Sequence, residues 1–496
     1  MDEKIKNLKA DIVIIGGGGA GLAAALAAAE KGAANITVLE KRGATGGTSA
    51  MASGIFAADS PAQKRQAIIA RKDDLFQRTM NFTHLTVNPR IVRAFINRSG
   101  DTVRWLEDKG IYFYCVPHSP IDNPLTWHVP KGNGAEIMQV LARECKKRGV
   151  EIILHSAAKE LFTGRKGKLT GVLVERESES FTIETQGAVI ATGGFGGNKE
   201  LLKKYCPKYR ENMRLSGLPN QGDGFLMAAG IGAAAEGLGT LMIGGPFAGQ
   251  AGKITLGSEA DGVPIQMVFI SGEPYVIWVN KQGKRFIDET ASFNYYESIN
   301  ALIQQPDCIS FALFDSAIVN MITENGLGNV PSGFDFGERQ RSPLPAGLEN
   351  ELRLQAEKGA LKIAGSWDEI ADWMGANRTV LRATMDEYNT ACDHGYDSMF
   401  AKDRAYLQPL RTPPYYAVKC MSSMLNTIGG IRVNEHMEVL DKQDIPIPGL
   451  YAAGVDVGGW SSETYHAALP GTAFGFAINS GRIAGENAFK FVSGLH

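Results

Sequence analysis

Three glycines and one acidic residue near the start of the chain have the spacing of a dinucleotide-binding site. The turn Gly16-x-Gly18-x-x-Gly21 is followed about 20 residues later by Glu40. In this pattern the first glycine permits a tight turn, the second lets a pyrophosphate approach the backbone, and the third lets a helix pack closely on a sheet. Glu40 can accept hydrogen bonds from ribose hydroxyls and would repel a 2′-phosphate, which disfavours NADP.

The elements predicted around these residues are the ones that such a site requires. Residues 11–15 form a short apolar run that predicts a buried parallel strand, and the alanine-rich residues 22–31 predict a helix closed by Gly32. A second apolar run, 36–39, predicts the next strand and ends at Glu40. Because the helix follows the glycine turn directly, its amide groups and partial positive charge would face the phosphates.

Composition excludes several classes of protein. The chain has 496 residues, 58 of them glycine, and a net charge of −2 without a basic tract, so we expect no nucleic acid partner. Its six cysteines form no CxxC pair, so we expect no metal site and favour a reducing, cytoplasmic location. The longest apolar run, 13–29, contains four successive glycines and is shorter than the roughly 20 residues of a membrane-spanning helix, so we expect no membrane span.

Three later segments repeat the character of a cofactor site. Residues 46–54 are small and rich in hydroxyl groups, and the apolar runs at 188–194 and 449–454 both end in glycine, with Asp456 just beyond the second. A cofactor that touches the start, the middle and the end of the chain must be long. This favours FAD over NAD.

With these motifs the chain resembles the flavoprotein family of fumarate reductases, succinate dehydrogenases, aspartate oxidases and 3-ketosteroid dehydrogenases. The resemblance extends over nearly the whole chain, in the family's order, and is not specific for one substrate. The motifs that carry it are Gly16-x-Gly18-x-x-Gly21, Glu40-Lys41, Gly46-Gly47-x-Ser49, Ala191-Thr192-Gly193-Gly194, Gly222-Asp223-Gly224, Val279-Asn280-x-x-Gly283-x-Arg285-Phe286-x-x-Glu289, Gly429-Gly430, residues 447–454 and residues 481–485.

The resemblance implies an α/β fold: a Rossmann-like FAD-binding domain of the glutathione-reductase type with an inserted α+β capping domain for the substrate. We expect the FAD-binding domain to comprise residues 1–240 and 415–496, and the cap to comprise residues 241–414. Amphipathic helical stretches between residues 352 and 389 agree with a cap that lacks nucleotide motifs, and residues 331–345 predict a long loop.

The resemblance also implies that the FAD is bound without a covalent link. Succinate dehydrogenases of membrane complexes attach FAD through a histidine in the loop after the second glycine pair, whereas the first histidine here is His84. No haem motif precedes the fold, so we expect a separate electron donor or acceptor. The residues expected to bind the cofactor are Gly16, Gly18, Gly19, Ala20, Gly21, Glu40, Lys41, Gly46, Gly47, Thr48, Ser49, Ser53, Gly54, Ala158, Ala191, Thr192, Gly193, Asp223, Gly454, Asp456, Gly471, Thr472 and Ala473.

Reactions of this family move a hydride between flavin N5 and a carbon next to an activating carbonyl or carboxylate. Fumarate-type enzymes hold two carboxylates with histidine and arginine side chains, but the corresponding positions here carry Phe293, Asn426 and Ala468. A dicarboxylate would be left without cationic partners, at a cost of several kcal/mol for each unpaired anion. We therefore disfavour fumarate, succinate and aspartate as substrates.

Ketosteroid dehydrogenases use tyrosines and a glycine amide around a ketone. The matching positions here are Phe293, followed by Tyr295 and Tyr296, and Ala467, preceded by Tyr465 and His466, with Gly471 at the glycine position. Because adjacent residues project in different directions, we expect at most one of the two adjacent tyrosines to enter the pocket. The candidate catalytic residues are Tyr295, Tyr296, Tyr465, His466, Arg285 and Gly471, and Trp127 and His128 are further candidates for the wall of the pocket.

These features predict an FAD-dependent oxidoreductase that reduces or forms a C=C bond conjugated to a carbonyl, in an enone or ketosteroid-like substrate. Two alternatives stay open. One is a reductase of a small unsaturated carboxylic acid, for which Arg285 would be the carboxylate ligand to test. The other is a subunit that binds FAD only to transfer electrons, against which the complete cap argues, since a cap excludes water from a reacting substrate.

Overall fold

A six-stranded sheet forms the core of one half of the computed structural model, which describes residues 7–118, 123–177, 179–248, 267, 270–326, 348–466 and 469–495. Five neighbouring strands of the sheet pair in parallel, and the edge strand β18 runs antiparallel to its neighbour. In spatial order the strands are β18 (Glu438–Leu440), β19 (Pro446–Ala452), β11 (Gly187–Ile190), β2 (Ile12–Ile15), β3 (Ile36–Leu39) and β7 (Glu151–Ile153).

Two helices from opposite ends of the sequence pack on one another beside this sheet. They are α1 (Gly19–Lys31), which Gly32 ends in a left-handed conformation, and α14 (Thr472–Ser493). A side chain at Gly481 would place its Cβ 2.2 Å from the Ala20 carbonyl oxygen, so only glycine permits this distance between the helices. The predicted unit of strand, glycine turn, helix and strand is therefore confirmed.

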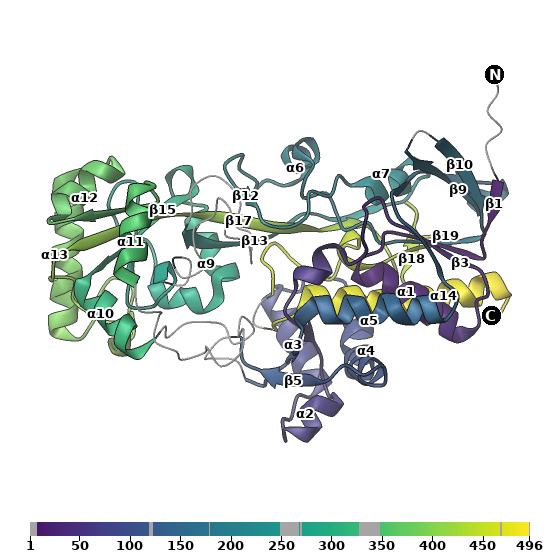
Figure 1. Cartoon of the computed structure of the whole chain (residues 1–496), viewed down its shortest axis with the longest axis horizontal. Helices are drawn as coiled ribbons and strands as arrows, with labels where there is room; N and C mark the ends of the chain where they lie inside the picture. The colour runs from purple at the N-terminus through teal and green to yellow at the C-terminus, as the bar shows by residue number, and fades with distance from the viewer. Residues whose placement is uncertain are drawn as a thin grey trace.

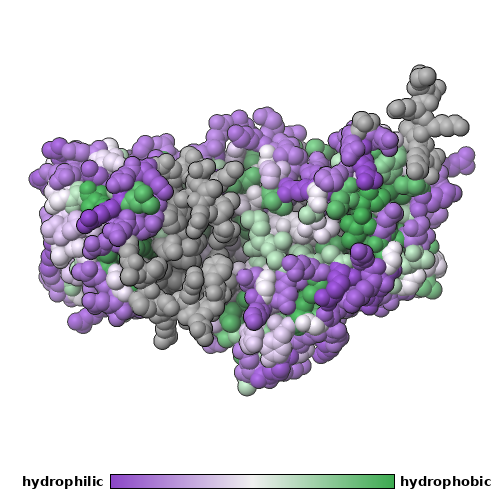
Figure 2. Space-filling model, viewed as in Figure 1, coloured by the Kyte–Doolittle hydropathy of each residue, from purple (hydrophilic) through white to green (hydrophobic). Residues whose placement is uncertain are grey.

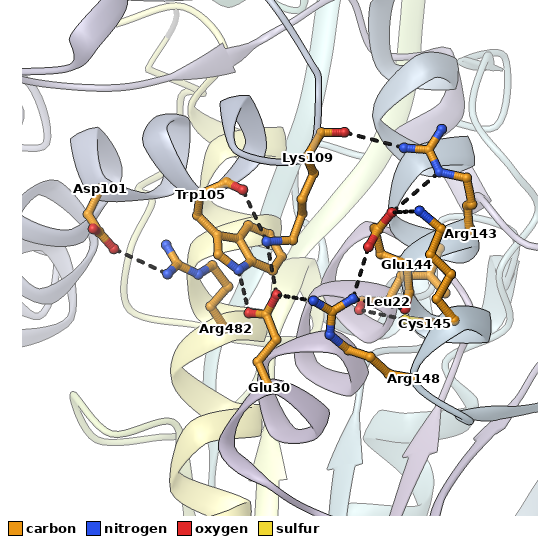
Figure 3. A network of polar contacts seen from close by, with 11 residues as sticks. Leu22, Glu30, Asp101, Trp105, Lys109, Arg143, Glu144, Cys145, Arg148 and Arg482 are labelled. Carbon is orange, nitrogen blue, oxygen red and sulfur yellow. Dashed lines mark hydrogen bonds and ion pairs between the residues drawn. The ribbon is translucent and has the colours of Figure 1, made fainter.

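A polar and aromatic network holds the outer ends of these helices to their neighbours α4 (Pro89–Glu107) and α5 (Asn133–Lys147), as Figure 3 shows. The Trp105 indole N–H donates to Glu30 of α1 at 2.6 Å, and Lys109 pairs with the same carboxylate at 2.9 Å. The cations of Lys109 and Arg482 lie 4.2 Å and 4.6 Å from the centre of the Trp105 ring. Trp105 of α4 thus contacts both terminal helices: α1 through its hydrogen bond to Glu30, and α14 through the cation–π contact with Arg482.

Smaller sheets flank the central one. A four-stranded sheet consists of β1 (Asn7–Lys9), β10 (Glu179–Glu184), β9 (Leu169–Arg176) and β8 (Ser156–Thr163). A three-stranded sheet consists of β4 (Ile55–Phe56), β6 (Trp127–Pro130) and β5 (Phe113–Val116). The helices α2 (Pro61–Arg65), α3 (Lys72–Phe82), α6 (Lys199–Tyr205) and α7 (Asp223–Gly230) complete this half of the molecule.

Two long strands, β13 (Ala235–Ala248) and β17 (Tyr415–Ile431), run from this half into the other (Figure 1). β17 pairs with β13 and with the short strand β12 (Arg214–Leu215) in its second part, and its first part pairs with β15 (Ile309–Asp315) and β16 (Leu361–Ala364). β17 thus begins at the predicted boundary between residues 414 and 415 and belongs to both halves. The domain boundaries themselves stay predictions.

The cap, residues 241–414 as predicted, contains its own apolar core around β14 (Ile277–Asn280) and β15. Residues 352–389 are helical as expected, apart from β16, whereas the predicted loop at 331–345 lies outside the described residues. The cap helices are α9 (Tyr295–Leu302), α10 (Ser316–Asn325), α11 (Leu348–Glu357), α12 (Trp367–Met374) and α13 (Arg378–His394).

The face of the molecule drawn in Figure 2 is largely hydrophilic. Hydrophilic side chains cover the cap helices in Figure 2, and apolar residues gather toward the middle of the other half. No helix among the described residues is long and apolar enough to cross a membrane. The cytoplasmic location stays a prediction.

A buried charge cluster joins the strands and loops of the cap. The Glu289 carboxylate is fully buried and accepts hydrogen bonds from Arg285 at 2.9 Å and from Lys402 at 3.0 Å. Burial acts to raise the pKa of Glu289, but the charges of Lys402 and Arg285 hold that pKa below its ordinary value. Asp397 is a second carboxylate on Arg285, at 3.0 Å.

We expect Glu289→Gln to destabilise the protein by about 3–5 kcal/mol, because the substitution leaves Lys402 buried without its counter-charge. Urea unfolding measures this change. The matched control is Asp372→Asn in the same half, which breaks an ion pair with Arg378 whose side chains are 51% and 58% exposed and which is worth roughly 0–1 kcal/mol. Equal losses in the two variants would contradict the assigned role of the cluster.

Candidate functional site

A cavity of about 380 Å³ opens where the first half of the fold meets the cap. Its walls come from segments that are far apart in the sequence: the glycine turn before α1, the loop after Gly46, the ends of β11 and β19, the middle of β17, and the N-termini of α9 and α14. The carboxyl ends of parallel strands therefore meet at one side of the sheet, where such folds bind their ligands.

The glycine turn holds its shape through contacts that a side chain would prevent. Gly16 has φ +110°, and a Cβ there would lie 2.2 Å from the Ala191 carbonyl oxygen. A Cβ at Gly21 would lie 1.8 Å from the Gly16 carbonyl oxygen, so Gly21 serves the packing of α1 and does not line the cavity. At Gly18, by contrast, the nearest atom to a Cβ lies 3.9 Å away, so this glycine faces open space in the cavity.

The acidic residue after β3 is held in place by the backbone. The Glu40 carboxylate accepts the Gly17 N–H and the Arg42 N–H, both at 2.9 Å, and still lines the cavity. Next to it Lys41 pairs with Asp223 at 2.6 Å, and both of these side chains also line the cavity. The buried, oriented Glu40 carboxylate and the partly exposed pair of Lys41 and Asp223 together supply the acceptors and the donor that a ribose requires.

Asp456 has a different role from the one predicted. It does not line the cavity and is 1% exposed. Its carboxylate accepts the N–H groups of Gly193 at 3.0 Å and Gly194 at 2.8 Å, and the Thr192 hydroxyl at 3.1 Å. Burial raises the pKa of Asp456, and these hydrogen bonds oppose the rise. Asp456 therefore positions the turn after β11, whose Thr192 and Gly193 do face the cavity.

The donor set of the cavity fits FAD. Thr48 has a buried hydroxyl without a partner, and that residue lines the cavity beside the open space at Gly18. The predicted cofactor residues that line the cavity are Gly16, Gly18, Gly19, Ala20, Glu40, Lys41, Gly47, Thr48, Ser49, Ser53, Gly54, Ala158, Ala191, Thr192, Gly193, Asp223, Gly454, Gly471 and Ala473.

Two further predicted cofactor residues do not line the cavity. The Gly46 N–H donates to the Gly17 carbonyl oxygen at 2.8 Å, so Gly46 fixes the loop against the turn. The Thr472 hydroxyl donates to the Leu469 carbonyl oxygen within the first turn of α14, so it is used locally.

A continuous row of aromatic side chains forms the other end of the cavity. The ring of His118 lies 5.0 Å from Trp127 and 5.7 Å from Tyr295. Tyr296 follows at 4.4 Å from Tyr295, and Tyr465 at 4.7 Å from Tyr296, measured between ring centres. All five line the cavity. The expectation that at most one of the adjacent tyrosines enters is wrong, because the chain changes from a 3-10 turn to helix α9 at this point and directs both rings inward.

The hydroxyl groups of Tyr295 and Tyr296 are hydrogen-bonded to each other, and burial raises the pKa of both groups. The Tyr465 oxygen accepts the Ala473 N–H at 2.9 Å, at the N-terminus of α14. Since the amide occupies an acceptor position of the oxygen, the Tyr465 proton stays available to a ligand. Gly471, with φ +80°, begins this helix.

His466 and Arg285 are not at the cavity. The His466 ring is stacked on Phe82 at 4.1 Å and is 4% exposed, and burial lowers its pKa to about 3. Arg285 is held by the buried carboxylates of the cap. Both predictions of a catalytic role are therefore wrong in their placement. Ala467 and Ala468 lie outside the described residues.

Several lining residues were missed from the sequence or predicted only weakly. Trp127 lines the cavity, whereas its neighbour His128 bonds Ser60 at 2.6 Å and is fully buried elsewhere. His118 gave no signal, because a single histidine in a loop has no periodic pattern. Burial lowers its pKa to about 4, so the ring is neutral at pH 7. The other residues in this group are Ser216, Met242, Gly244, Phe247, Ser423, Leu425 and Asn426.

The chain matches known proteins over nearly its whole length. A family model described as an FAD binding domain matches residues 11–472. A vinyl phenol reductase of Lactiplantibacillus plantarum is 31% identical over 98% of this chain and 97% of its own length. An NADH:fumarate oxidoreductase of Klebsiella pneumoniae is 28% identical, and the match spans 98% of this chain and about half (48%) of that protein.

Solved structures agree with the fold. The open conformation of a flavocytochrome c3 fumarate reductase has a TM-score of 0.74 at 26% identity and covers 98% of this chain and 79% of its own. A 3-ketosteroid delta1-dehydrogenase of Sterolibacterium denitrificans has a TM-score of 0.77 at 19% identity, over 97% and 99% of the two chains, which shows a shared fold alone. The predicted α/β fold with an FAD-binding domain is confirmed.

We expect Asp456→Asn to raise the dissociation constant of FAD roughly ten- to hundredfold, because a hydrogen bond to a charged group is worth about 1.5–3 kcal/mol and the amide cannot accept all of the present donors. Fluorescence titration of the apoprotein with FAD measures it. Asp444→Asn, at a side chain that is 67% exposed, is the control. The same dissociation constant in both variants would contradict the positioning role of Asp456.

Proposed function

We propose that this chain, which belongs to the FAD binding domain family, is an FAD-dependent oxidoreductase that reduces a C=C bond conjugated to an oxygen through a carbonyl group or an aromatic ring. The observation that carries the proposal is the row of aromatic side chains that continues the cofactor cavity. The similarity to a vinyl phenol reductase supports an aromatic substrate.

The charges around the cavity support a substrate whose reacting part is uncharged. Among the described residues, the ionised side chains on its wall are Glu40, Lys41, Arg42 and Asp223, all at the ribose end. The side chains that the structure describes at the aromatic end are uncharged: the tyrosine hydroxyls, the Trp127 indole and the neutral imidazole of His118. An apolar wall with a few polar groups suits a conjugated organic molecule.

Bound FAD supplies the transfer of a hydride to or from carbon. The side chains of the cavity stabilise the negative charge that develops on the substrate and supply the proton that completes the reduction. When the conjugated oxygen is a carbonyl oxygen, hydride transfer to the far carbon moves electron density onto it, and the Tyr465 hydroxyl donates a hydrogen bond to that oxygen while the second carbon takes the one proton that the reaction needs. The Ala473 N–H and the positive end of α14 stabilise the Tyr465 oxygen in that event.

Tyr295 and Tyr296 form a second donor pair. Because the two hydroxyl groups are hydrogen-bonded to each other, they use one of their two protons between them, and the other can be directed at a ligand. This pair can protonate the second carbon of the reduced bond. A neutral phenol as acid agrees with the burial that raises both pKa values.

A reductase of a small dicarboxylate fits the cavity less well. Asn426 lines the cavity where fumarate-type enzymes carry a histidine, and Phe293 packs against Tyr406 at 5.6 Å instead of facing the cavity. Arg285, which this alternative needed, is bound by two carboxylates. We also infer non-covalent FAD and a separate electron donor, the former because the loop from Gly46 to Gly54 has no histidine.

The proposal is tested by reducing the bound FAD anaerobically and adding 4-vinylphenol, a simple enone or fumarate. We expect one of the first two to reoxidise the FAD within seconds and to yield the saturated product, and fumarate to have no effect. Reoxidation by fumarate alone would overturn the substrate assignment. If no alkene reoxidises the FAD, the alternative of an electron-transfer subunit is favoured.

We expect Tyr465→Phe to lower kcat on the accepted alkene by about 100-fold or more, the usual contribution of a positioned acid, and to leave the FAD content unchanged. Steady-state kinetics and the flavin absorbance measure the two quantities. Tyr451→Phe is the control, since this hydroxyl donates to the Asn487 carbonyl oxygen, away from the cavity. A similar kcat in both variants would remove Tyr465 from the mechanism.

A further inference from the structure

Arg214 is a buried cation that has no acidic partner among the described residues. It is 9% exposed, and its Nε has no hydrogen-bond partner. Burial lowers the pKa of the guanidinium, and no carboxylate opposes the shift. A charge in this position costs free energy until an anion or a set of acceptors lies beside it.

The register of the sheet places Arg214 on the same face as the cavity wall. Arg214 of β12 lies opposite Ser423 of β17, and Ser423 lies opposite Gly244 of β13 on its other side. Residues opposite each other in a sheet project from the same face. Ser423 and Gly244 both line the cavity, and Arg214 continues their row on the same face of the sheet, one strand beyond Ser423 and just outside the cavity wall itself.

Successive side chains along a strand point to opposite faces of the sheet, and this alternation gives Arg214 the same orientation by a second route. Leu215, Ile243 and Met424, the neighbours of this row in sequence, pack together in an apolar cluster on the opposite face. Ser216, two residues after Arg214, lines the cavity. In and around β12, Leu215 therefore points to the apolar cluster on one face of the sheet, and Arg214 points to the face on which the cavity lies.

A second polar group next to Arg214 is also unpaired. The Ser423 hydroxyl oxygen is buried without a hydrogen-bond partner, in a residue that is 5% exposed and lines the cavity. The strand row of Arg214, Ser423 and Gly244 ends next to the aromatic side chains, because the Tyr295 ring packs directly on Gly244. A Cβ at Gly244 would lie 2.7 Å from a carbon of that ring. Two strand spacings, about 10 Å, separate the backbone at Gly244 from the backbone at Arg214.

We propose that Arg214 and Ser423 form a subsite for one carboxylate, so that the cavity accepts conjugated substrates or competing ligands that carry a single carboxylate beside an aromatic group. The proposal deepens the function given above and rests on it for the use of the same cavity. The guanidinium presents paired donors to the two carboxylate oxygens, and the Ser423 hydroxyl adds a third. One such subsite serves a monocarboxylate and leaves the second carboxylate of a dicarboxylate unpaired.

The test compares the binding of 3-phenylpropionate and 3-phenylpropanol to the FAD-loaded protein by titration calorimetry. These probes share a ring and a chain and differ in the carboxylate. We expect the wild-type protein to bind the acid at least about tenfold more tightly than the alcohol, Arg214→Gln to lose this preference, and Ser423→Ala to reduce it severalfold. Equal binding of the two probes by the wild type, or a preference that persists in Arg214→Gln, would overturn the proposal.

Two further variants separate binding from folding. Arg210→Gln, at an exposed guanidinium that donates to the carbonyl oxygens of Pro207 and Tyr209, is expected to keep the preference. Arg214→Lys is expected to restore part of it. Because Arg214→Gln removes an unpaired buried charge, its unfolding midpoint without ligand is expected to equal or exceed that of the wild type. A lower midpoint would assign Arg214 a structural role and overturn the subsite.

The outcome is independent of catalysis, because neither probe contains a reducible bond. If the preference for the acid depends on Arg214 while no conjugated alkene reoxidises the FAD, the proposed reaction fails and the subsite is retained. If alkenes are reduced while the preference is absent, the reaction is retained and the subsite fails.

Discussion

The pairing of β13 with β17 is the constraint on which the rest of the site depends. The first part of β17 pairs with β15 and β16 of the cap, and its second part pairs with β13 beside the cavity. Residues of both strands, among them Met242, Gly244, Ser423 and Leu425, form one wall of the cavity. The same backbone therefore links the cofactor end to the aromatic end, and the Tyr295 ring of α9 packs against it at Gly244.

The cavity has two electrostatic regions that match two kinds of ligand. The ribose end presents an oriented carboxylate and an exposed ion pair to a solvated, polar group. The aromatic end presents rings and neutral hydroxyl groups, whose buried positions raise their pKa values. Arg214 lies on the same sheet face and has no acidic partner within the part of the chain that the structure describes, so one cation lies beside the uncharged aromatic end. A conjugated molecule with no more than one charge matches this distribution.

The sequence predicted the cofactor half closely and the substrate half only in part. The glycine turn, Glu40 and the hydroxyl-rich loop were found because close backbone approach and positive φ require glycine, which leaves a local pattern. The sequence placed Asp456 beside the cofactor site. Its contacts could not be predicted, because the backbone amides that donate to it belong to a segment about 260 residues away in the sequence.

The substrate half depends on contacts that leave no pattern in the sequence. His118, Trp127 and Phe247 come from separate loops and strands and meet only through the tertiary fold. The two adjacent tyrosines face the cavity together because the chain changes from a 3-10 turn to a helix between them and the preceding residues. His466 was expected near the ligand because of its place between two motifs, yet its ring is stacked on Phe82, which no local rule indicates.

The central claim is that one cavity joins the FAD to the row of aromatic side chains. A crystal structure of the FAD-loaded protein with bound 4-ethylphenol tests it most directly. The account predicts the phenol ring in contact with Trp127, Tyr295 or Tyr296, with its hydroxyl within hydrogen-bond distance of Tyr465 or Tyr295, and with the FAD in contact with the same ligand. A phenol bound outside the aromatic row, or separated from the FAD by protein, would contradict it.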